Sequence, residues 1–142
     1  MKLSNSDKEA IMQAIQQAEK RTSGEIRVHV TYDGQDDQPL ESARLIFLKL
    51  GMQATRDRNG VLIYFNPKAR KFALYGDSGI HEKLGQHYWD QLVSHVRDTI
   101  REKDLLAGIL DAVHALGEQL STHFPGDGHN PDELTNEVTE TN

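Results

Sequence analysis

The sequence of 142 residues contains no cysteine, which excludes disulfide bonds, zinc–thiolate sites and cysteine nucleophiles. It has no apolar run long enough to span a bilayer, and its first residues, MKLSNSD, are too polar for a signal peptide. We therefore expect a cytoplasmic protein with no membrane span. Nucleophile-elbow, phosphate-loop and dinucleotide-binding motifs in a strand–turn–helix context are missing as well, and no HExxH pair occurs.

Basic residues are lacking at the C-terminal end. From Pro125 onward there is no Lys or Arg, while the acidic residues there are Asp127, Asp132, Glu133, Glu137 and Glu140. Because the net charge of the whole chain is −6, residues 1–124 are close to neutral. This balance argues against a general nucleic-acid or anionic-membrane binder. The apolar periodicity also ends at Phe124, so we predict one folded domain over 1–124 and a disordered acidic tail over 125–142.

The whole chain is 37% hydrophobic and 27% charged, as is ordinary for one globular domain. Its patterns predict a helix capped at Ser6, a strand over 26–31, a helix over 41–55, strands over 61–65 and 71–75, and helices from 80 to 124. Two strands joined through a helix should be parallel, and the third should return antiparallel. The expected fold is a three-layer α/β/α sandwich, Rossmann-like, with a mixed sheet of three or four strands; the fourth would lie near the helix break at Lys103-Asp104.

Three polar turns adjoin these strands: 22–25, 56–60 and 76–79. The topology brings the entries of the first two strands and the exit of the third to one end of the sheet. Glu25, Asp57 and Asp77 would gather there and repel one another unless a cation, a proton or an arginine is shared. Oxygen ligands of this kind suit Ca²⁺ or Mg²⁺, with Asn59 or backbone carbonyls completing the shell.

Other residues of these turns suit an anion or a close backbone approach. Arginines can neutralise the carboxylates or hold a phosphate in a bidentate grip, and glycines let a ligand approach the chain. The candidate ligand- or phosphate-binding residues are Ser23, Gly24, Arg27, Arg58, Asn59, Gly76 and Ser78. The alternative is that these turns are purely structural, with Asp57 and Asn59 stabilising a turn and Glu25 pairing with an arginine.

Two further groups carry weaker signals. Asp33, Asp36 and Asp37 form an acidic cluster at the opposite end of the sheet, but they lack the EF-hand pattern and indicate a solvated loop. Five histidines of the helical half are predicted to be surface or partly buried helix residues and not metal ligands: His81, His87, His95, His114 and His123.

The three turns also carry a family resemblance. The segments TSGEI at 22–26, RNGVLI at 58–63 and GDSGI at 76–80 resemble the signature blocks of the TPM domain, and the similarity extends from Ser6 to Pro125. The segment HFP at 123–125 and the acidic end resemble the short, soluble bacterial branch of that family. The resemblance implies a Rossmann-like sandwich, divalent-metal binding, with calcium in some members, and acid phosphatase activity in some members. By motif position it assigns Glu25 and Asp77 as site acids, with Asp57 beside them.

The leading functional hypothesis is thus a cytoplasmic TPM-domain protein with a divalent-cation site at one end of the sheet. One alternative is a metal-assisted phosphomonoesterase, in which a cation bridges a phosphate and a bound water attacks. The other is a non-catalytic adaptor that recruits a protein partner through its helical face or its acidic tail.

Overall fold

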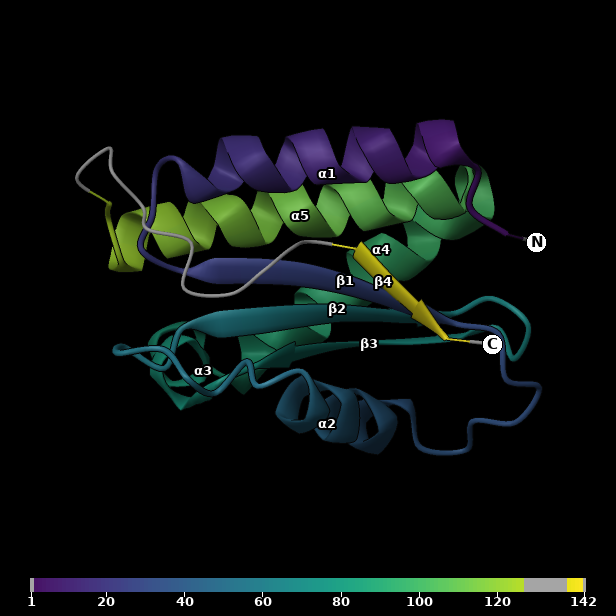
Figure 1. The fold of residues 1–142 in the computed structure, drawn as a ribbon, viewed down its shortest axis with the longest axis horizontal. Helices are drawn as coiled ribbons and strands as arrows, with labels where there is room; N and C mark the ends of the chain where they lie inside the picture. The colour runs from purple at the N-terminus through teal and green to yellow at the C-terminus, as the bar shows by residue number, and fades with distance from the viewer. Residues whose placement is uncertain (1, 127–137, 142) are drawn as a thin grey trace.

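The computed structural model describes residues 2–126 and 138–141 and has the predicted three layers (Figure 1). Helices α1 (Asn5–Glu19), α4 (Gln86–Glu102) and α5 (Leu105–His123) cover one face of a sheet, and α2 (Pro39–Lys49) covers the other. A short helix, α3 (Ser78–Leu84), connects the sheet to α4. The strands are β1 (Glu25–Thr31), β2 (Gly60–Asn66), β3 (Lys71–Gly76) and β4 (Val138–Thr141).

The sheet has the order β3-β2-β1-β4, which confirms the predicted mixed topology. Strands β1 and β2 are parallel, and β3 returns antiparallel to β2. The fourth strand differs from the prediction in its position. The chain near Lys103-Asp104 joins α4 to α5, and residues 138–141 instead pair in parallel with β1.

Side chains alternate between the two faces of the sheet, as strand geometry requires. Ile26, Val28 and Val30 of β1 belong to the large core beneath α1, α4 and α5. The β1 side chains on the opposite face of the sheet, toward α2, are polar: Glu25, Arg27 and His29. The α2 core is correspondingly small; its buried members are Ala43, Phe47, Met52, Leu62, Tyr64 and Ala73.

The cap of the first helix is Ser4, two residues before the predicted cap at Ser6. Ser4 and Asp7 form the capping box, with Ser4 Oγ accepting from Asp7 N and Asp7 Oδ2 accepting from Ser4 N, both at 3.0 Å. The sequence holds two overlapping Ser-x-x-acid patterns, at Ser4 and at Ser6. Starting at Ser4 places Leu3 in the core, which favours that register.

The second helix is shorter than predicted, since it spans Pro39–Lys49 and not 41–55. Gly51, with φ +72°, takes up the left-handed conformation just beyond it, which glycine adopts readily. Its buried residues are Ala43 and Phe47, while Leu45 of the predicted apolar stripe is exposed.

The predicted disordered tail is wrong for residues 138–141, while 127–137 lie outside the described residues. Strand β4 is fixed by polar contacts: His29 Nδ1 lies 2.6 Å from Thr139 Oγ1, and His29 Nε2 lies 3.2 Å from Thr141 Oγ1. Glu140 accepts a hydrogen bond from Tyr32 and pairs with Lys8 at 2.5 Å. These contacts hold the edge of the sheet without an apolar stripe in β4.

Candidate functional site

The three polar turns meet at one end of the sheet, as predicted. The register pairs Glu25 of β1 with Gly60 of β2, and Val61 of β2 with Gly76 of β3. The residues before β2 and after β3 therefore sit beside the start of β1, with neighbouring strands separated by about 4.8 Å. A backbone hydrogen bond joins the second turn to the third, since Asp77 N donates to Gly60 O at 2.9 Å.

Asp77 is buried and already has partners. Its Oδ2 accepts from Arg58 Nε at 2.7 Å and its Oδ1 from Arg58 Nη2 at 2.9 Å. Oδ1 also accepts from Ser78 N at 2.8 Å, so the carboxylate caps α3. The Asp77 hydrogen bond raises the pKa of the Arg58 guanidinium. Arg58 itself remains 52% exposed, so one side of this pair faces water.

Asn59 belongs to the second turn, contacts Ser23 of the first turn and is 1% exposed. Its amide nitrogen, Nδ2, donates to Ser23 Oγ at 3.2 Å. Its amide oxygen, Oδ1, is buried and has no hydrogen-bond partner in the part of the chain that the structure describes. A buried amide oxygen normally has a partner, since leaving it unpaired costs about 1–3 kcal/mol. A ligand or a water molecule would supply the missing partner of Asn59 Oδ1.

Glu25 opens β1 and is buried. Its cross-strand neighbour on the same face is Gly60, which adds no side chain of its own. Arg27 follows two residues later on that face and is buried as well. A buried carboxylate and a buried guanidinium thus line the same strip of β1.

Asp57 and Ser78 do not join this group through their side chains. The Asp57 carboxylate is partly exposed and lies 3.6 Å from Arg56, and Ser78 is exposed. Within residues 2–126 and 138–141, no three His, Asp or Glu side chains are placed to hold one metal ion. Any cation at this end would therefore rely on amide, hydroxyl and backbone oxygens beside a carboxylate.

The loop that carries Ser23 is anchored to the end of α5, which the sequence did not indicate. Thr22 Oγ1 donates to Leu120 O at 3.0 Å and also contacts Phe124 O, while Ser23 N donates to Phe124 O at 3.0 Å. Gly24 fits tightly, because a Cβ there would lie 2.7 Å from a Leu120 methyl carbon. The loop is therefore held in position before β1 begins.

The acidic loop at the opposite end is not wholly solvated. Asp36 is buried, and its carboxylate accepts from Tyr64 Oη at 2.6 Å, Ser42 Oγ at 2.7 Å and Asn66 Nδ2 at 3.4 Å. Burial, and then the bond to Asp36, raise the pKa of Tyr64. This network ties the loop to β2, while Asp33 and Asp37 are exposed as predicted.

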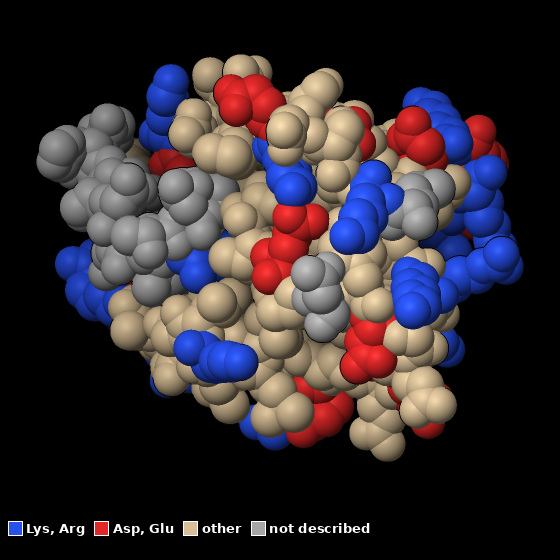
Figure 2. Space-filling model, turned by 45° about the vertical axis from the view of Figure 1, so that its right-hand side comes forward, with Lys and Arg blue, Asp and Glu red and all other residues tan. Residues whose placement is uncertain are grey.

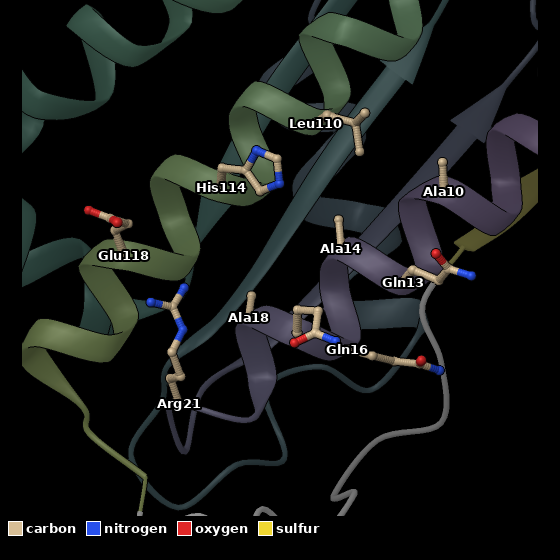
Figure 3. Close-up of a pocket in the computed structure, with 10 residues that line it drawn as sticks. Ala10, Gln13, Ala14, Gln16, Ala18, Arg21, Leu110, His114 and Glu118 are labelled. Atoms are coloured by element: carbon tan, nitrogen blue, oxygen red, sulfur yellow. The ribbon is translucent and has the colours of Figure 1, made fainter.

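One pocket of about 450 Å³ lies between α1 and α5 (Figure 3). Small side chains of α1, including Ala10, Ala14 and Ala18, line one wall, and Leu110 and His114 of α5 line the other. None of the predicted site residues lines it. Four of the five helical histidines are exposed and His123 is partly buried, which agrees with the predicted surface or partly buried positions.

Charges on the surface are mixed. Figure 2 shows Lys and Arg side chains interspersed with Asp and Glu on the face in view. In the described residues, no helix has the length and apolar character needed to cross a membrane.

Comparison with known proteins fits this fold and these turns. The TPM domain model matches residues 2–119. The chain belongs to the TPM domain family. No curated protein matches it significantly.

Solved structures agree. The NMR structure of the BA42 protein from the psychrophilic bacterium Bizionia argentinensis is 32% identical, with a TM-score of 0.87 over 99% of this chain and 96% of that one. The N-terminal domain of a P. gingivalis protein has a TM-score of 0.67 at 19% identity, covering 86% and 78%. The N-terminal domain of cg2496 from Corynebacterium glutamicum has a TM-score of 0.66 at 15% identity, covering 96% and 85%. The last two are similar in fold.

Proposed function

We propose that this TPM-domain protein binds a divalent cation, Ca²⁺ or Mg²⁺, at the sheet end formed by Ser23, Glu25 and Asn59. The observation that carries the proposal is the buried Asn59 Oδ1, which lacks a hydrogen-bond partner among the described residues. Amide, hydroxyl and carboxylate oxygens are the ligands that hard cations prefer. A bound cation would supply the missing partner of the amide oxygen, and the negative charge of Glu25 would attract the ion.

Asp77 and Asp57 would act differently in this proposal. Asp77 can join the shell only by giving up part of its bond to Arg58, which already satisfies both carboxylate oxygens. Asp57 can reach it only by moving from its partly exposed position beside Arg56. Glu25 and Asn59 are therefore the residues whose loss should weaken binding most.

The test is an NMR titration of the full chain with CaCl₂ and, separately, MgCl₂. We expect shifts centred on the backbone amides of residues 22–26 and 57–61, and a large loss of affinity in Glu25→Gln and in Asn59→Leu. Asp33→Asn, an exposed acid at the opposite end, is the matched control and should bind as wild type. The proposal fails if millimolar cation shifts nothing, or if Glu25→Gln and Asn59→Leu bind like the control.

A phosphomonoesterase is the second candidate, and the observation that favours it is the half-exposed Arg58. Its guanidinium uses two donors on Asp77 and can direct others to a phosphate oxygen. The Ser23 hydroxyl accepts from the Asn59 amide, and an amide is not a general base, so a bound water is the more suitable nucleophile. Hydrolysis of an aryl phosphate should then require added metal and fall sharply in Arg58→Gln; activity that survives in both Arg58→Gln and Glu25→Gln would come from another site or a contaminant.

A further inference from the structure

Strand β3 forms the edge of the sheet opposite β4 (Figure 1), and part of its backbone points away from the sheet. In an antiparallel pair, every second residue directs both its N–H and its C=O toward the partner strand. Asp77 N donates to Gly60 O of β2, so the residues of β3 at odd distances from Asp77 direct these groups outward. They are Phe72, Leu74 and Gly76. Among the described residues, no hydrogen bond reaches these outward N–H and C=O groups.

One flank of α2 borders this edge. Phe47 of α2 packs edge-on against Tyr75 of β3, with the ring centroids 4.9 Å apart. The ridge beside Phe47 carries Arg44, with Leu40 and Leu48 one turn before and after it. The two leucines are 57% and 41% exposed. They form an apolar wall beside the outward backbone groups of β3.

The opposite flank of α2 faces the middle of the sheet, which fixes the rotation of the helix. Ser42 Oγ donates to Asp36 at 2.7 Å, and the same carboxylate accepts from Tyr64 Oη of β2 at 2.6 Å. At 100° per residue, Ser42 lies about 160° around the helix from Arg44. The ridge of Arg44 is therefore the one on the side of the β3 edge.

Helix α4 supplies a second wall on the other face of the sheet. The guanidinium carbon of Arg97 lies 5.8 Å from the centroid of the Phe72 ring of β3. Val93 and Arg101 lie one turn before and after Arg97 on the same ridge. Both arginines are exposed, and neither forms an ion pair within residues 2–126 and 138–141. This wall is therefore basic.

We propose that the outer edge of β3 binds an extended peptide segment of a partner protein as a fifth strand, with apolar side chains toward α2 and acidic side chains toward α4. An added strand gives partners to the outward backbone groups, and its alternate side chains point to opposite faces. The apolar set meets Leu40 and Leu48, and the acidic set meets Arg97 and Arg101. The partner segment is thus defined by alternating apolar and acidic residues.

A second copy of this chain suits the edge less well. Its own β3 would bring a second ridge of arginines to the same place, and like charges oppose such a pairing. An acidic segment instead neutralises the arginines that are present. Charge complementarity therefore favours the peptide as the occupant of this edge.

The experiment is an NMR titration of the full chain with an acetylated and amidated peptide, EVEVEVE. EDTA is present throughout, so the result does not depend on the proposed cation site. The amides of Phe72, Leu74 and Gly76 should shift and exchange more slowly with solvent, because they gain acceptors. The peptide EEVVVEE has the same composition but cannot separate valine from glutamate on two faces, and KVKVKVK reverses the charge. Both should bind much more weakly.

Matched variants test each wall. Leu48→Ser should weaken EVEVEVE binding about fivefold, from the apolar contact that is lost. Leu45→Ser is its control, because Leu45 is 53% exposed on the same helix but lies about 160° from Phe47 and points away from the sheet. Arg97→Gln should weaken binding about threefold, as for an exposed charge pair. The exposed Arg21 of the α1 end gives the control Arg21→Gln, which should bind as wild type.

Three results would overturn the proposal. The first is an absence of shifts at the β3 amides with millimolar EVEVEVE. The second is equal binding of EVEVEVE and EEVVVEE, or equal losses in Leu48→Ser and Leu45→Ser. The third is protection of the same β3 amides without peptide, together with slower diffusion at high protein concentration, since a second copy would then be the occupant.

Discussion

Arg58 and Asp77, which lie nineteen residues apart, form a two-point ion pair across the ends of β2 and β3. The same Asp77 carboxylate accepts from Ser78 N and caps α3. One side chain thus closes the sheet end and starts the next helix. The two roles can be separated by substitution.

Asp77→Ala removes both roles and should lower the free energy of unfolding by at least about 1 kcal/mol, the usual cost of losing a helix cap. Asp77→Asn keeps a capping oxygen and should cost less, because a half-exposed ion pair contributes little. Urea unfolding at neutral pH measures both. If Asn and Ala cost the same, the Arg58 pair and not the cap supplies the stability.

Gly79→Ala should destabilise the protein strongly. A Cβ at that position would overlap the Asp57 carbonyl oxygen and lie 2.7 Å from Arg58 O, and backbone atoms cannot rotate away. We expect a loss of about 2–3 kcal/mol, as for other overpacked sites. Gly34→Ala is the control: its Cβ would meet only the Lys68 side chain, at 3.6 Å, and urea midpoints should be nearly those of wild type.

His29 should make stability fall as pH drops below neutrality. Burial lowers its pKa in the folded state, with Lys49 and Arg27 acting in the same direction and Glu140 against it. The unfolded chain takes up this proton near pH 6.5, while the native chain does so only at lower pH. Between the two values the unfolded state binds more protons, so the free energy of unfolding decreases with falling pH and levels off below the native pKa.

Urea unfolding between about pH 5 and 7 checks this. The decrease should be shallower in His29→Asn, whose side chain does not titrate. An NMR titration gives the direct reading. A His29 resonance that titrates at or above the ordinary histidine pKa would contradict the prediction.

Removal of residues 138–142 should lower the free energy of unfolding by about 2 kcal/mol, because several hydrogen bonds worth about 1 kcal/mol each are lost from β1. His29 should also become more exposed, and its pKa should rise toward the ordinary value. The double variant Thr139→Val, Thr141→Val keeps a β-branched strand but removes both contacts to His29. It should retain β4 and change mainly the histidine titration. An unchanged melting temperature on truncation would mean that β4 adds nothing to stability.

The sequence predicted the layers and the topology well because both follow from local periodicity. Ile26, Val28 and Val30 alternate with polar residues along the first strand, and Asn66 and Pro67 indicate the turn of the hairpin over 66–70. Convergence of the three turns then followed from strand direction alone. Strand β4 could not be found this way, because its single valine gives no pattern and its stability comes from distant partners such as His29.

The site was harder to predict than the fold. Residue types placed Glu25, Asn59 and Asp77 at one end, but the choice of Arg58 as the partner of Asp77 depends on how the side chains are oriented. Arg58 has φ 50°, a left-handed backbone conformation that sequence patterns do not reveal for arginine. The anchoring of Thr22 on the end of α5 joins residues 98 positions apart, which is beyond any local signal.

The edge position of β4 has a consequence for the order in which the molecule assembles. Its contacts with β1 join residues 110 positions apart, whereas β2 and β3 meet through a turn of a few residues. Closing the longer loop costs more chain entropy and is slower. The β2–β3 hairpin should therefore acquire amide-exchange protection early in refolding, and the β1–β4 ladder should close last and open first.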